Sequence, residues 1–294
     1  MIATTGFFDG VHCGHRLVID RLVSLARERG DKSLVVTFWP HPRAVLQDGA
    51  RELRLLSALE EKKSLLQGLG VDRVEVLDFT RRVASLTAEQ YLRDILQARF
   101  GVTTLLMGYD NRLGSDRLTA STLRSSVPGI DVIELPPLSF RAEPQAESRN
   151  LEVSSTRIRN ALEIGDIAAA NGMLGYGYSL TGAVVAGNRL GRTIGFPTAN
   201  MMLYEPLKLV PARGVYAVQV QVLGQTHRGM TNIGVRPTVG GTVPTIETHI
   251  LDFNEDIYGL PLRITFLRRI RNEVRFPSLD ALKRQLEKDR EACR

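Results

Sequence analysis

Two histidines, His12 and His15, stand three residues apart in the glycine-bearing segment 6–15 (GFFDGVHCGH). The segment lies between a short apolar run and an amphipathic one, so we expect it to join a strand to the start of a helix. A helix start offers unpaired backbone N–H groups and partial positive charge, and glycine lets an anion approach the backbone closely. Both imidazoles can then donate hydrogen bonds to one phosphate group. The spacing therefore predicts a phosphate site.

Two other interpretations of this segment stay open. A single histidine in a loop is usually an ordinary surface side chain or a helix cap. The chain has only five histidines, however, and His12, His15 and His41 all lie in loops expected to follow strands of one sheet. A zinc site would need a third ligand, and Cys13 would point elsewhere if the two histidines converged. Phosphate binding is favoured over both alternatives.

A second group of candidate residues lies in the C-terminal half. Segment 182–192 (GAVVAGNRLGR) runs from an expected strand into a glycine-rich loop that can present backbone N–H groups to phosphates. The segment matches neither the P-loop pattern GxxxxGK[ST] nor the dinucleotide-binding pattern GxGxxG. Segment 195–200 (GFPTAN) follows it, and by itself this could be a plain proline turn. Farther on, strand alternation places Glu247 and His249 on one face, where Glu247 could also form an ordinary surface ion pair.

The elements that must position these residues differ between the two halves. In the first half, β-rich runs alternate with helical patterns, which predicts an α/β domain with parallel strands joined by crossovers. A helix over 15–29 should end at Gly30. Capping boxes of Ser57 with Glu60, and of Thr87 with Gln90, indicate two more helix starts. The expected strands of the first half are 2–5, 34–38, 73–77, 104–107 and 131–135.

From residue 179 onward the pattern becomes a series of β-branched strands separated by glycine and proline turns. This pattern predicts a small antiparallel β-barrel with a terminal helix over 278–291 packed on it. Residues 175–178 (GYGY) are the expected linker, which gives domains of 1–175 and 179–294. A helix is expected over 156–163. The expected barrel strands are 180–186, 215–222, 228–233, 245–251 and 262–266.

Composition narrows the class of protein. The chain has 294 residues, of which 43% are hydrophobic and 24% charged, values typical of a globular protein of two ordinary domains. No apolar run approaches the roughly 20 residues of a membrane span, and the start lacks a signal segment, so we expect a cytoplasmic protein with no membrane partner. Two cysteines are too few for a disulfide framework or a four-cysteine zinc site.

The net charge of +6 permits nucleic-acid binding, but basic residues alternate with acidic ones and aromatic residues make up only 6% of the chain. A stacking platform for single strands is therefore poorly supported. Anionic small molecules such as nucleotides are the expected partners, and nucleic acid is not.

The N-terminal segments resemble a known family. Segments 6–15 and 37–42 (TFWPHP) match the patterns GxFDGVHxGH and TFxPHP of the adenylyltransferase module of bacterial FAD synthetases, within the wider HxGH nucleotidyltransferase group. Segment 154–159 (SSTRIR) matches that group's SSTxIR pattern, although alone it is equally a plain helix cap. Segment 108–114 (GYDNRLG) resembles GxDFRFG, with Asn111 and Leu113 in place of the phenylalanines.

This resemblance implies a Rossmann-like domain in which His12 and His15 are catalytic. They would stabilise transfer of the adenylyl group of ATP to the phosphate of FMN, by positioning and charge stabilisation without a covalent intermediate. The residues that it implies for ATP or phosphate binding are Gly6, Phe7, Asp9, Gly14, Ser155, Thr156 and Arg159. Weaker flavin or nucleotide contacts are implied for His41, Asp110 and Asn111.

The C-terminal segments resemble riboflavin kinases. The pattern GxxxGRTIGFPTAN covers 187–200, and segments 232–238 and 246–251 follow in the family's order. The resemblance implies that Thr198 and Asn200 bind Mg²⁺ and nucleotide phosphate, a role that suits neutral oxygen ligands. It implies that Glu247 is the general base for the ribityl 5′-hydroxyl of riboflavin. The further ATP or phosphate contacts of this domain are Gly187, Gly191 and Arg192.

Together these expectations describe a bifunctional enzyme of flavin-cofactor synthesis. Riboflavin and ATP would give FMN and ADP in the barrel, and FMN and a second ATP would give FAD and pyrophosphate in the α/β domain, with Mg²⁺ serving both steps. One alternative is an enzyme that retains only one of the two activities. The other is a flavin- or nucleotide-binding regulator without turnover. The sequence does not indicate the number of subunits.

Overall fold

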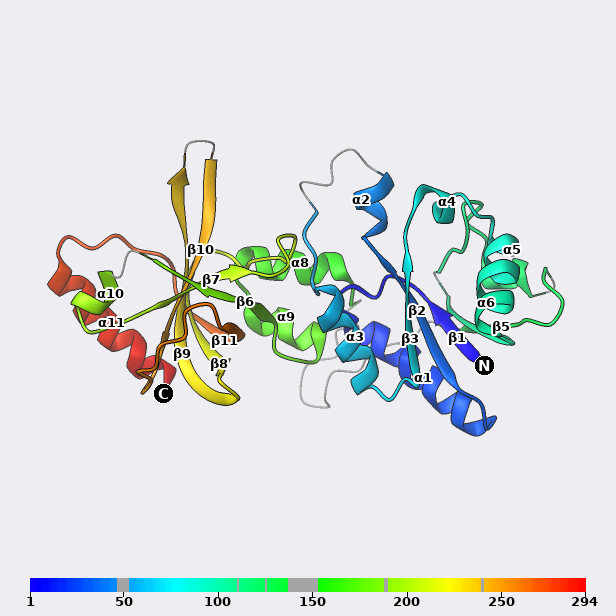
Figure 1. The fold of residues 1–294 in the computed structure, drawn as a ribbon, viewed down its shortest axis with the longest axis horizontal. Coiled ribbons are helices and arrows are strands. Elements are labelled where there is room, and N and C mark those ends of the chain that lie inside the picture. The colour runs from blue at the N-terminus through cyan, green and yellow to red at the C-terminus, as the bar shows by residue number, and fades with distance from the viewer. Residues whose placement is uncertain (47–52, 110, 125, 137–152, 188–189, 239–240) are drawn as a thin grey trace. The chain divides into compact units, whose positions relative to one another are not determined.

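The computed structural model divides into two compact units, Met1–Ser155 and Thr156–Arg294, and each is considered by itself. Figure 1 labels the helices and strands. The residues that the structure describes are 1–46, 53–109, 111–124, 126–136, 153–187, 190–238 and 241–294.

The first unit is built on a five-stranded parallel sheet in the order β3-β2-β1-β4-β5. All five strands expected from the sequence are present, and their bounds differ by no more than one residue at either end. Alternation along β1 sends Ile2 to one face of the sheet and Ala3 to the other, and both are fully buried. The strands are β1 (Ile2–Thr5), β2 (Ser33–Trp39), β3 (Arg73–Asp78), β4 (Thr104–Gly108) and β5 (Asp131–Leu135).

Helices cover both faces of this sheet, which is why its central strand β1 is buried along its whole length. Helices α1 (Cys13–Glu28) and α3 (Leu59–Gly68) pack on the face of Ile2. The opposite face is covered by α5 (Ala88–Gln90), the π-helical segment η3 (Tyr91–Gln97) and α6 (Ala98–Phe100), as Figure 1 shows. The remaining short helices are η1 (Asp9–Val11), α2 (Pro42–Leu46), α4 (Arg81–Ala84) and α7 (Ala120–Leu123).

One of the two expected capping boxes is confirmed and the other is wrong. Thr87 and Gln90 form reciprocal hydrogen bonds of 2.9 and 3.2 Å at the start of α5. The helix near Ser57 begins later, at Leu59, and the backbone N–H of Ala58 donates to Glu61 Oε2 at 2.9 Å. Ser57 does not cap this helix because its hydroxyl is buried and accepts from the backbone N–H of Gly10 at 3.0 Å.

The second unit is a closed antiparallel barrel in the order β10-β7-β6-β11-β8-β9, which confirms the expected architecture. All five expected strands occur, and β7 is an additional strand that the sequence did not predict. The strands are β6 (Ser179–Val185), β7 (Ala199–Leu203), β8 (Gly214–Val222), β9 (Gln225–Thr238), β10 (Gly241–Ile250) and β11 (Pro261–Arg271). Its helices are α8 (Ser155–Ile164), α9 (Ile167–Leu174), α10 (Leu190–Thr193) and α11 (Leu279–Cys293).

The segment expected to be a linker, 175–178, is packed into the second unit. Tyr178 is fully buried, and its hydroxyl donates to the carbonyl of Leu209 at 2.7 Å. Its backbone N–H donates to Asn171 of α9, whose amide in turn donates to the carbonyl of Phe266 in β11 at 3.0 Å. Helix α9 is thereby fastened to the barrel.

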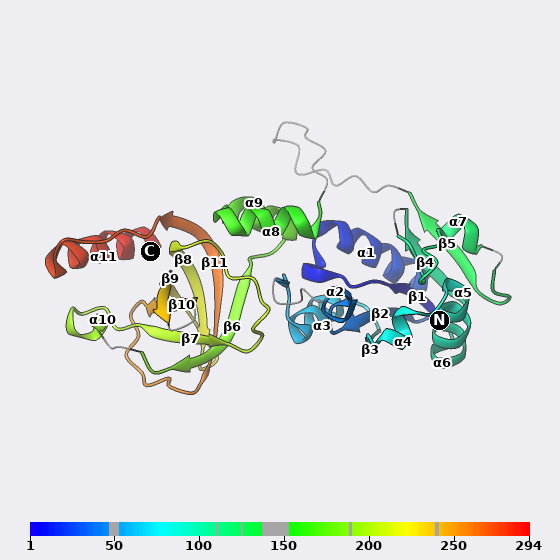
Figure 2. The ribbon, with the colours of Figure 1, turned by 90° about the horizontal axis from the view of Figure 1, so that it is seen from above.

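Helix α11 packs against β8 and β9 of the barrel, as Figure 2 shows. Arg271 at the end of β11 forms a bidentate ion pair with Asp289 of α11, with nitrogen-to-oxygen distances of 2.7 to 3.1 Å. Asp289 is almost fully buried and also accepts from Gln285 at 2.9 Å. The helix thus encloses the small core around Phe196, next to the segment that carries Thr198 and Asn200.

Candidate active sites

The loop that carries the two histidines has an unusual backbone. Phe8 and Val11 have φ angles of 52° and 37°, and Gly10 between them has a φ of 77°. Left-handed conformations are unfavourable for residues other than glycine, so surrounding contacts must hold this loop in place. The main contact comes from Asp9, whose buried carboxylate accepts hydrogen bonds from the backbone N–H groups of Leu56 and Ser57 at 3.0 and 3.1 Å.

The loop ends with His12 as the N-cap of α1, and this helix begins two residues earlier than expected. Nδ1 of His12 accepts from the backbone N–H of His15 at 3.4 Å, so a neutral His12 carries its proton on Nε2. The two imidazole rings are stacked with centroids 3.6 Å apart and planes 16° from parallel. The structure therefore brings His12 and His15 together at a helix start.

His15 is held in its neutral form. Burial lowers the pKa of His15 well below its usual 6.5, and the neighbouring charges of His12 and Lys62 lower this pKa further. Its Nδ1 atom is buried and has no hydrogen-bond partner among the described residues. No hydrogen bond between Nδ1 and a described residue therefore fixes the tautomer of this ring.

Lys62 of α3 is a site residue that the sequence analysis missed. Its side chain is fully buried, and Nζ donates to the carbonyls of Phe7 and Phe38 at 3.0 and 3.4 Å. Burial lowers the pKa of Lys62 to about 8, against the opposing effect of the Asp9 carboxylate. A signal was present, because Lys62 lies three residues after Leu59 and four before Leu66, on the apolar stripe of the helix.

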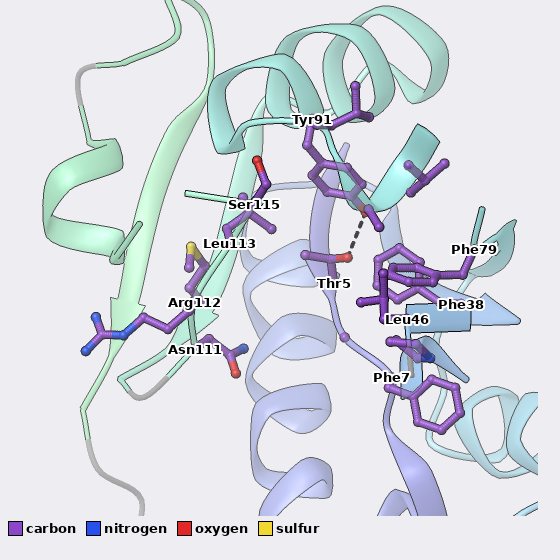
Figure 3. A pocket seen from close by; sticks show the side chains of 17 residues that line it. Thr5, Phe7, Phe38, Leu46, Phe79, Tyr91, Asn111, Arg112, Leu113 and Ser115 are labelled. Carbon is purple, nitrogen blue, oxygen red and sulfur yellow. Dashed lines mark hydrogen bonds between the residues drawn. The ribbon is translucent and has the colours of Figure 1, made fainter. Parts of the chain in front are cut away.

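A cavity of about 520 Å³ adjoins the histidine loop and shares Gly6 and Phe7 with it. Figure 3 shows Phe7, Phe38, Leu46 and Phe79 on one side of this cavity and Asn111, Arg112, Leu113 and Ser115 on the other. The hydroxyls of Thr5 and Tyr91 share a hydrogen bond of 2.8 Å between the two sides. The cavity is thus mainly apolar, and Asn111 contributes an amide to its lining.

The other residues predicted for the N-terminal site have different positions. The His41 ring lies 4.1 Å from the Phe7 ring, between centroids, so this histidine does lie near the loop. Ser155 donates its hydroxyl proton to the carbonyl of Asp9 at 3.2 Å. Gly14 is half-buried in the first turn of α1. Thr156 and Arg159 lie on α8, in the second unit, and Asp110 lies outside the described residues.

The barrel brings the predicted C-terminal residues together by strand register. Glu247 of β10 lies directly opposite Asn200 of β7 on one side and Asn232 of β9 on the other. Residues paired in this way project from the same face of a sheet, with Cβ atoms about 5 Å apart. Thr198, two residues before Asn200, precedes β7. One carboxylate and several neutral oxygens can therefore converge at this face.

The glycine-rich loop packs closely on this group. A Cβ atom on Gly187 would lie 2.2 Å from Nδ2 of Asn200, and one on Gly191 would lie 2.1 Å from the carbonyl oxygen of Phe196. Only glycine permits both approaches. The backbone N–H of Phe196 also donates to the carbonyl of Gly191 at 2.8 Å. Arg192, in contrast, is exposed on α10.

His249 supports the same segment from β10. Its Nδ1 lies 2.8 Å from the carbonyl oxygen of Pro197, and its ring centroid lies 5.2 Å from that of Phe196. Because a carbonyl only accepts, Nδ1 of His249 is the donor. Burial lowers the pKa of His249, which favours the neutral ring. His249 therefore helps to fix the chain just before Thr198.

The donor groups suit a hard cation better than zinc. Within the part of the chain that the structure describes, no group of three or more His, Cys, Asp or Glu side chains is placed to hold a metal ion. Thr198, Asn200 and Glu247 carry oxygen atoms, the kind of donor that Mg²⁺ prefers over the nitrogen and sulfur donors typical of zinc sites. Neither Cys13 nor Cys293 forms a disulfide.

No helix among the described segments has the length and apolar character that crossing a membrane requires.

Comparisons with known proteins agree over the whole chain. Residues 1–155 match the family model of FAD synthetase, and residues 174–294 match that of riboflavin kinase. Proteins described as bifunctional riboflavin kinase/FMN adenylyltransferase are similar to it along nearly their full length. The protein of Escherichia coli strain K12 is 38% identical, and the alignment covers 98% of this chain and 90% of that protein. The Pseudomonas fluorescens protein is 39% identical, and the alignment covers 100% of this chain and 92% of that protein. The Bacillus subtilis protein is 34% identical, and the alignment covers 99% of this chain and 90% of that protein.

The structure is also similar to a crystal structure described as a macrolide-efflux protein from Streptococcus pneumoniae. The TM-score is 0.89 at 34% sequence identity, and the superposition covers 99% of this chain and 93% of that one.

Proposed function

This chain belongs to the family of bifunctional riboflavin kinase/FMN adenylyltransferase proteins, and from that premise we propose which of its residues carry each reaction. It phosphorylates riboflavin with ATP to give FMN, and it transfers the adenylyl group of a second ATP to FMN to give FAD. We assign the adenylyl transfer to residues 1–175 and the phosphorylation to residues 179–294, although α8 and α9, within the first of these ranges, belong to the second compact unit. We further propose a cytoplasmic location, where ATP for both steps is available.

The observation that carries the first assignment is the stacked pair His12 and His15 at the start of α1, beside a cavity of about 520 Å³. An oxygen of the FMN phosphate attacks the α-phosphorus of ATP while the bond to the β-phosphate breaks, and pyrophosphate leaves. Nε2–H of His12 and the ring of His15 donate hydrogen bonds to the oxygens on which negative charge grows. The N–H groups at the start of α1, including that of Gly14, add to this stabilisation.

The cavity suits the flavin of FMN. The rings of Phe7, Phe38 and Phe79 offer apolar and stacking surface to the isoalloxazine, and the amide of Asn111 can bond to its polar edge. His41, which contacts Phe7, is proposed as a flavin or nucleotide contact. The same role for Asp110 stays a prediction.

We propose that Asp9 and Ser155 act by stabilising the histidine loop. The Asp9 carboxylate holds the backbone of residues 56 and 57, and Ser155 holds the carbonyl of Asp9, so both side chains stabilise the histidine loop. We propose that this loop, including Gly6 and Phe7, forms one wall of the phosphate site. Binding of ATP phosphates by Thr156 and Arg159 stays a prediction from the resemblance.

In the barrel, Glu247 is proposed as the general base that takes the proton of the ribityl 5′-hydroxyl. The hydroxyl oxygen then attacks the γ-phosphorus of ATP, and ADP leaves. Thr198 and Asn200 would hold Mg²⁺ and a phosphate oxygen, and the metal ion would neutralise negative charge on the phosphates. Gly187, Gly191 and Arg192 are proposed as further contacts of ATP, with the close packing of the two glycines in support.

One incubation tests these assignments. Purified protein with riboflavin, ATP and Mg²⁺, sampled over time and resolved by chromatography, should show FMN first and FAD later. FMN without FAD would refute the assignment of adenylyl transfer to the histidine loop. Flavin binding with neither product would refute both assignments and favour a regulatory protein.

A further inference from the structure

The buried cation Lys62 lies behind the histidine loop and joins it to the flavin cavity. Its Nζ donates to the carbonyl of Phe7, which follows β1, and to the carbonyl of Phe38 near the end of β2. The same atom lies 3.8 Å from the centroid of the Phe7 ring, a residue that lines the cavity. One side chain from α3 thus fixes the ends of two neighbouring strands.

Asp9 and Lys62 both hold the first part of the histidine loop. Asp9 reaches out to the backbone of residues 56 and 57, just before α3. Lys62 reaches back from α3 to Phe7, two residues before Asp9. The left-handed residue Phe8 lies between these anchors and Gly10 lies next to Asp9, so the two side chains contribute to maintaining this conformation.

The charge of Lys62 also acts on the proposed catalytic histidine. The groups that face His15 are the His12 ring at the start of α1, the Phe8 ring of the loop and the Lys62 ammonium of α3. Lys62 itself faces the Asp9 carboxylate and the rings of Phe7 and Trp39. A nearby positive charge disfavours a protonated imidazole, in agreement with the lowered pKa of His15.

Burial of a lysine is costly to the fold, and a methionine of similar length would fill the space without desolvating a charge. The presence of a charge therefore calls for a function. We propose that Lys62 is a positioning residue for adenylyl transfer: it ties the histidine loop to the flavin cavity and, while protonated, places a positive charge near His15. This inference rests on the proposed assignment of adenylyl transfer to His12 and His15.

The test compares Lys62→Met with Lys63→Met in the full-length protein. Lys63 is the next residue of α3, but it pairs with Glu60 at the surface, at 3.1 Å. The rate of FAD formation from FMN should fall by about tenfold or more in Lys62→Met, because small displacements of reacting groups strongly lower the reaction rate. FMN formation from riboflavin should not change, and Lys63→Met should match the wild type in both reactions.

A second measurement tests whether Lys62 acts on His15 or only stabilises the fold. The His15 imidazole is titrated by NMR in the ligand-free protein, with its signal assigned by its loss in His15→Asn. It should titrate at higher pH in Lys62→Met than in the wild type. Lys62→Arg, which keeps the charge, should leave the titration near that of the wild type. If Lys62→Met does not fold, Lys62→Gln replaces it under the same criteria.

Unchanged FAD formation in Lys62→Met would overturn the inference. A loss of FAD formation with an unchanged titration of His15 would overturn it too, because Lys62 would then be only a structural support. If the wild type forms no FAD, the proposed function itself fails, and this inference fails with it.

Discussion

The histidine loop of the first unit and the Glu247 face of the barrel position their residues by different means. His12 and His15 are neighbours in sequence, but their loop has a strained backbone and depends on distant side chains such as Asp9 and Lys62. Glu247 and Asn200 are 47 residues apart, yet strand pairing alone places them opposite each other. A loop site needs support from elsewhere, whereas a sheet site obtains its geometry from register.

The two sites also differ in their use of charge. The first contains the buried imidazole of His15 and the buried ammonium of Lys62, and burial lowers the pKa of both groups, so its chemistry depends on protonation. The second combines one carboxylate with neutral oxygen donors. We therefore expect the two reactions to respond separately to substitution and differently to pH.

The largest effect is expected for Glu247→Gln, which keeps the shape of the side chain but removes the carboxylate of the proposed base. Riboflavin phosphorylation should fall by about 10²–10⁴-fold, while FAD formation from supplied FMN stays at the wild-type rate. Initial rates of the two reactions, measured separately by chromatography, test this. Glu255→Gln, at an exposed position, is the matched control. Equal loss of both reactions would contradict the separation of the sites.

The next largest effect is expected for His15→Asn, which keeps a polar side chain but removes the imidazole. FAD formation from FMN should fall by about 10²–10³-fold, as for loss of one donor that stabilises growing negative charge. FMN formation from riboflavin should be unaffected, and it serves as the internal control of folding in the second unit. An FAD rate close to that of the wild type would remove His15 from the proposed mechanism.

Lys62, which lies in the first unit, should make the unfolding free energy of the protein depend on pH. Its pKa is lowered from 10.5 to about 8 in the folded protein, so between these pH values the unfolded chain holds a proton that the folded chain has released. The unfolding free energy of the wild type should therefore rise with pH across this window, by roughly 3 kcal/mol relative to Lys62→Met. Below pH 8 the difference between the two proteins should be constant.

Denaturant unfolding of both proteins at several pH values from 7 to 10.5 measures this effect. A difference in unfolding free energy that does not change over that range would show that Lys62 is not titrated as its burial implies.

The smallest of these effects is expected for Gly187→Ala. The added Cβ would lie 2.2 Å from Nδ2 of Asn200, so the Asn200 side chain must move away from its position opposite Glu247. Riboflavin phosphorylation should fall on the order of tenfold, with little change in melting temperature, because the displaced group is the end of one side chain. Gly172→Ala, where a Cβ meets nothing within 4 Å, is the control.

The sequence predicted the architecture well, because strand and helix periodicity reflect burial in both units. The strands of the parallel sheet were placed to within a residue, since their apolar runs are fully covered by helices. Strand β7 was missed because its residues, Ala199–Leu203, overlap the Thr198 and Asn200 motif and include an exposed Met202. Its pattern of burial is therefore weak.

The histidine pair was predicted because its two residues lie close together in the sequence, but the residues that support the pair were not predicted. Ser57 carries a sequence pattern typical of a helix cap, yet its hydroxyl is occupied by the loop 47 residues earlier. Lys62 lies on the apolar stripe of its helix, but it also lies beside a second lysine and two glutamates, a composition typical of a solvated helix face, which hides that signal. In both cases tertiary contacts decided the role of the residue, and local sequence carries little information about them.

The closure of the barrel also has a consequence for the order in which the chain acquires its activities during synthesis. The parallel sheet is complete once β5 ends at Leu135, whereas β6 obtains one of its two neighbours only when β11, Pro261–Arg271, has been made. Pairing over such a distance along the chain is slow and late. The catalyst of the second reaction is therefore synthesised first, and the kinase that supplies its FMN is completed only near the end of translation.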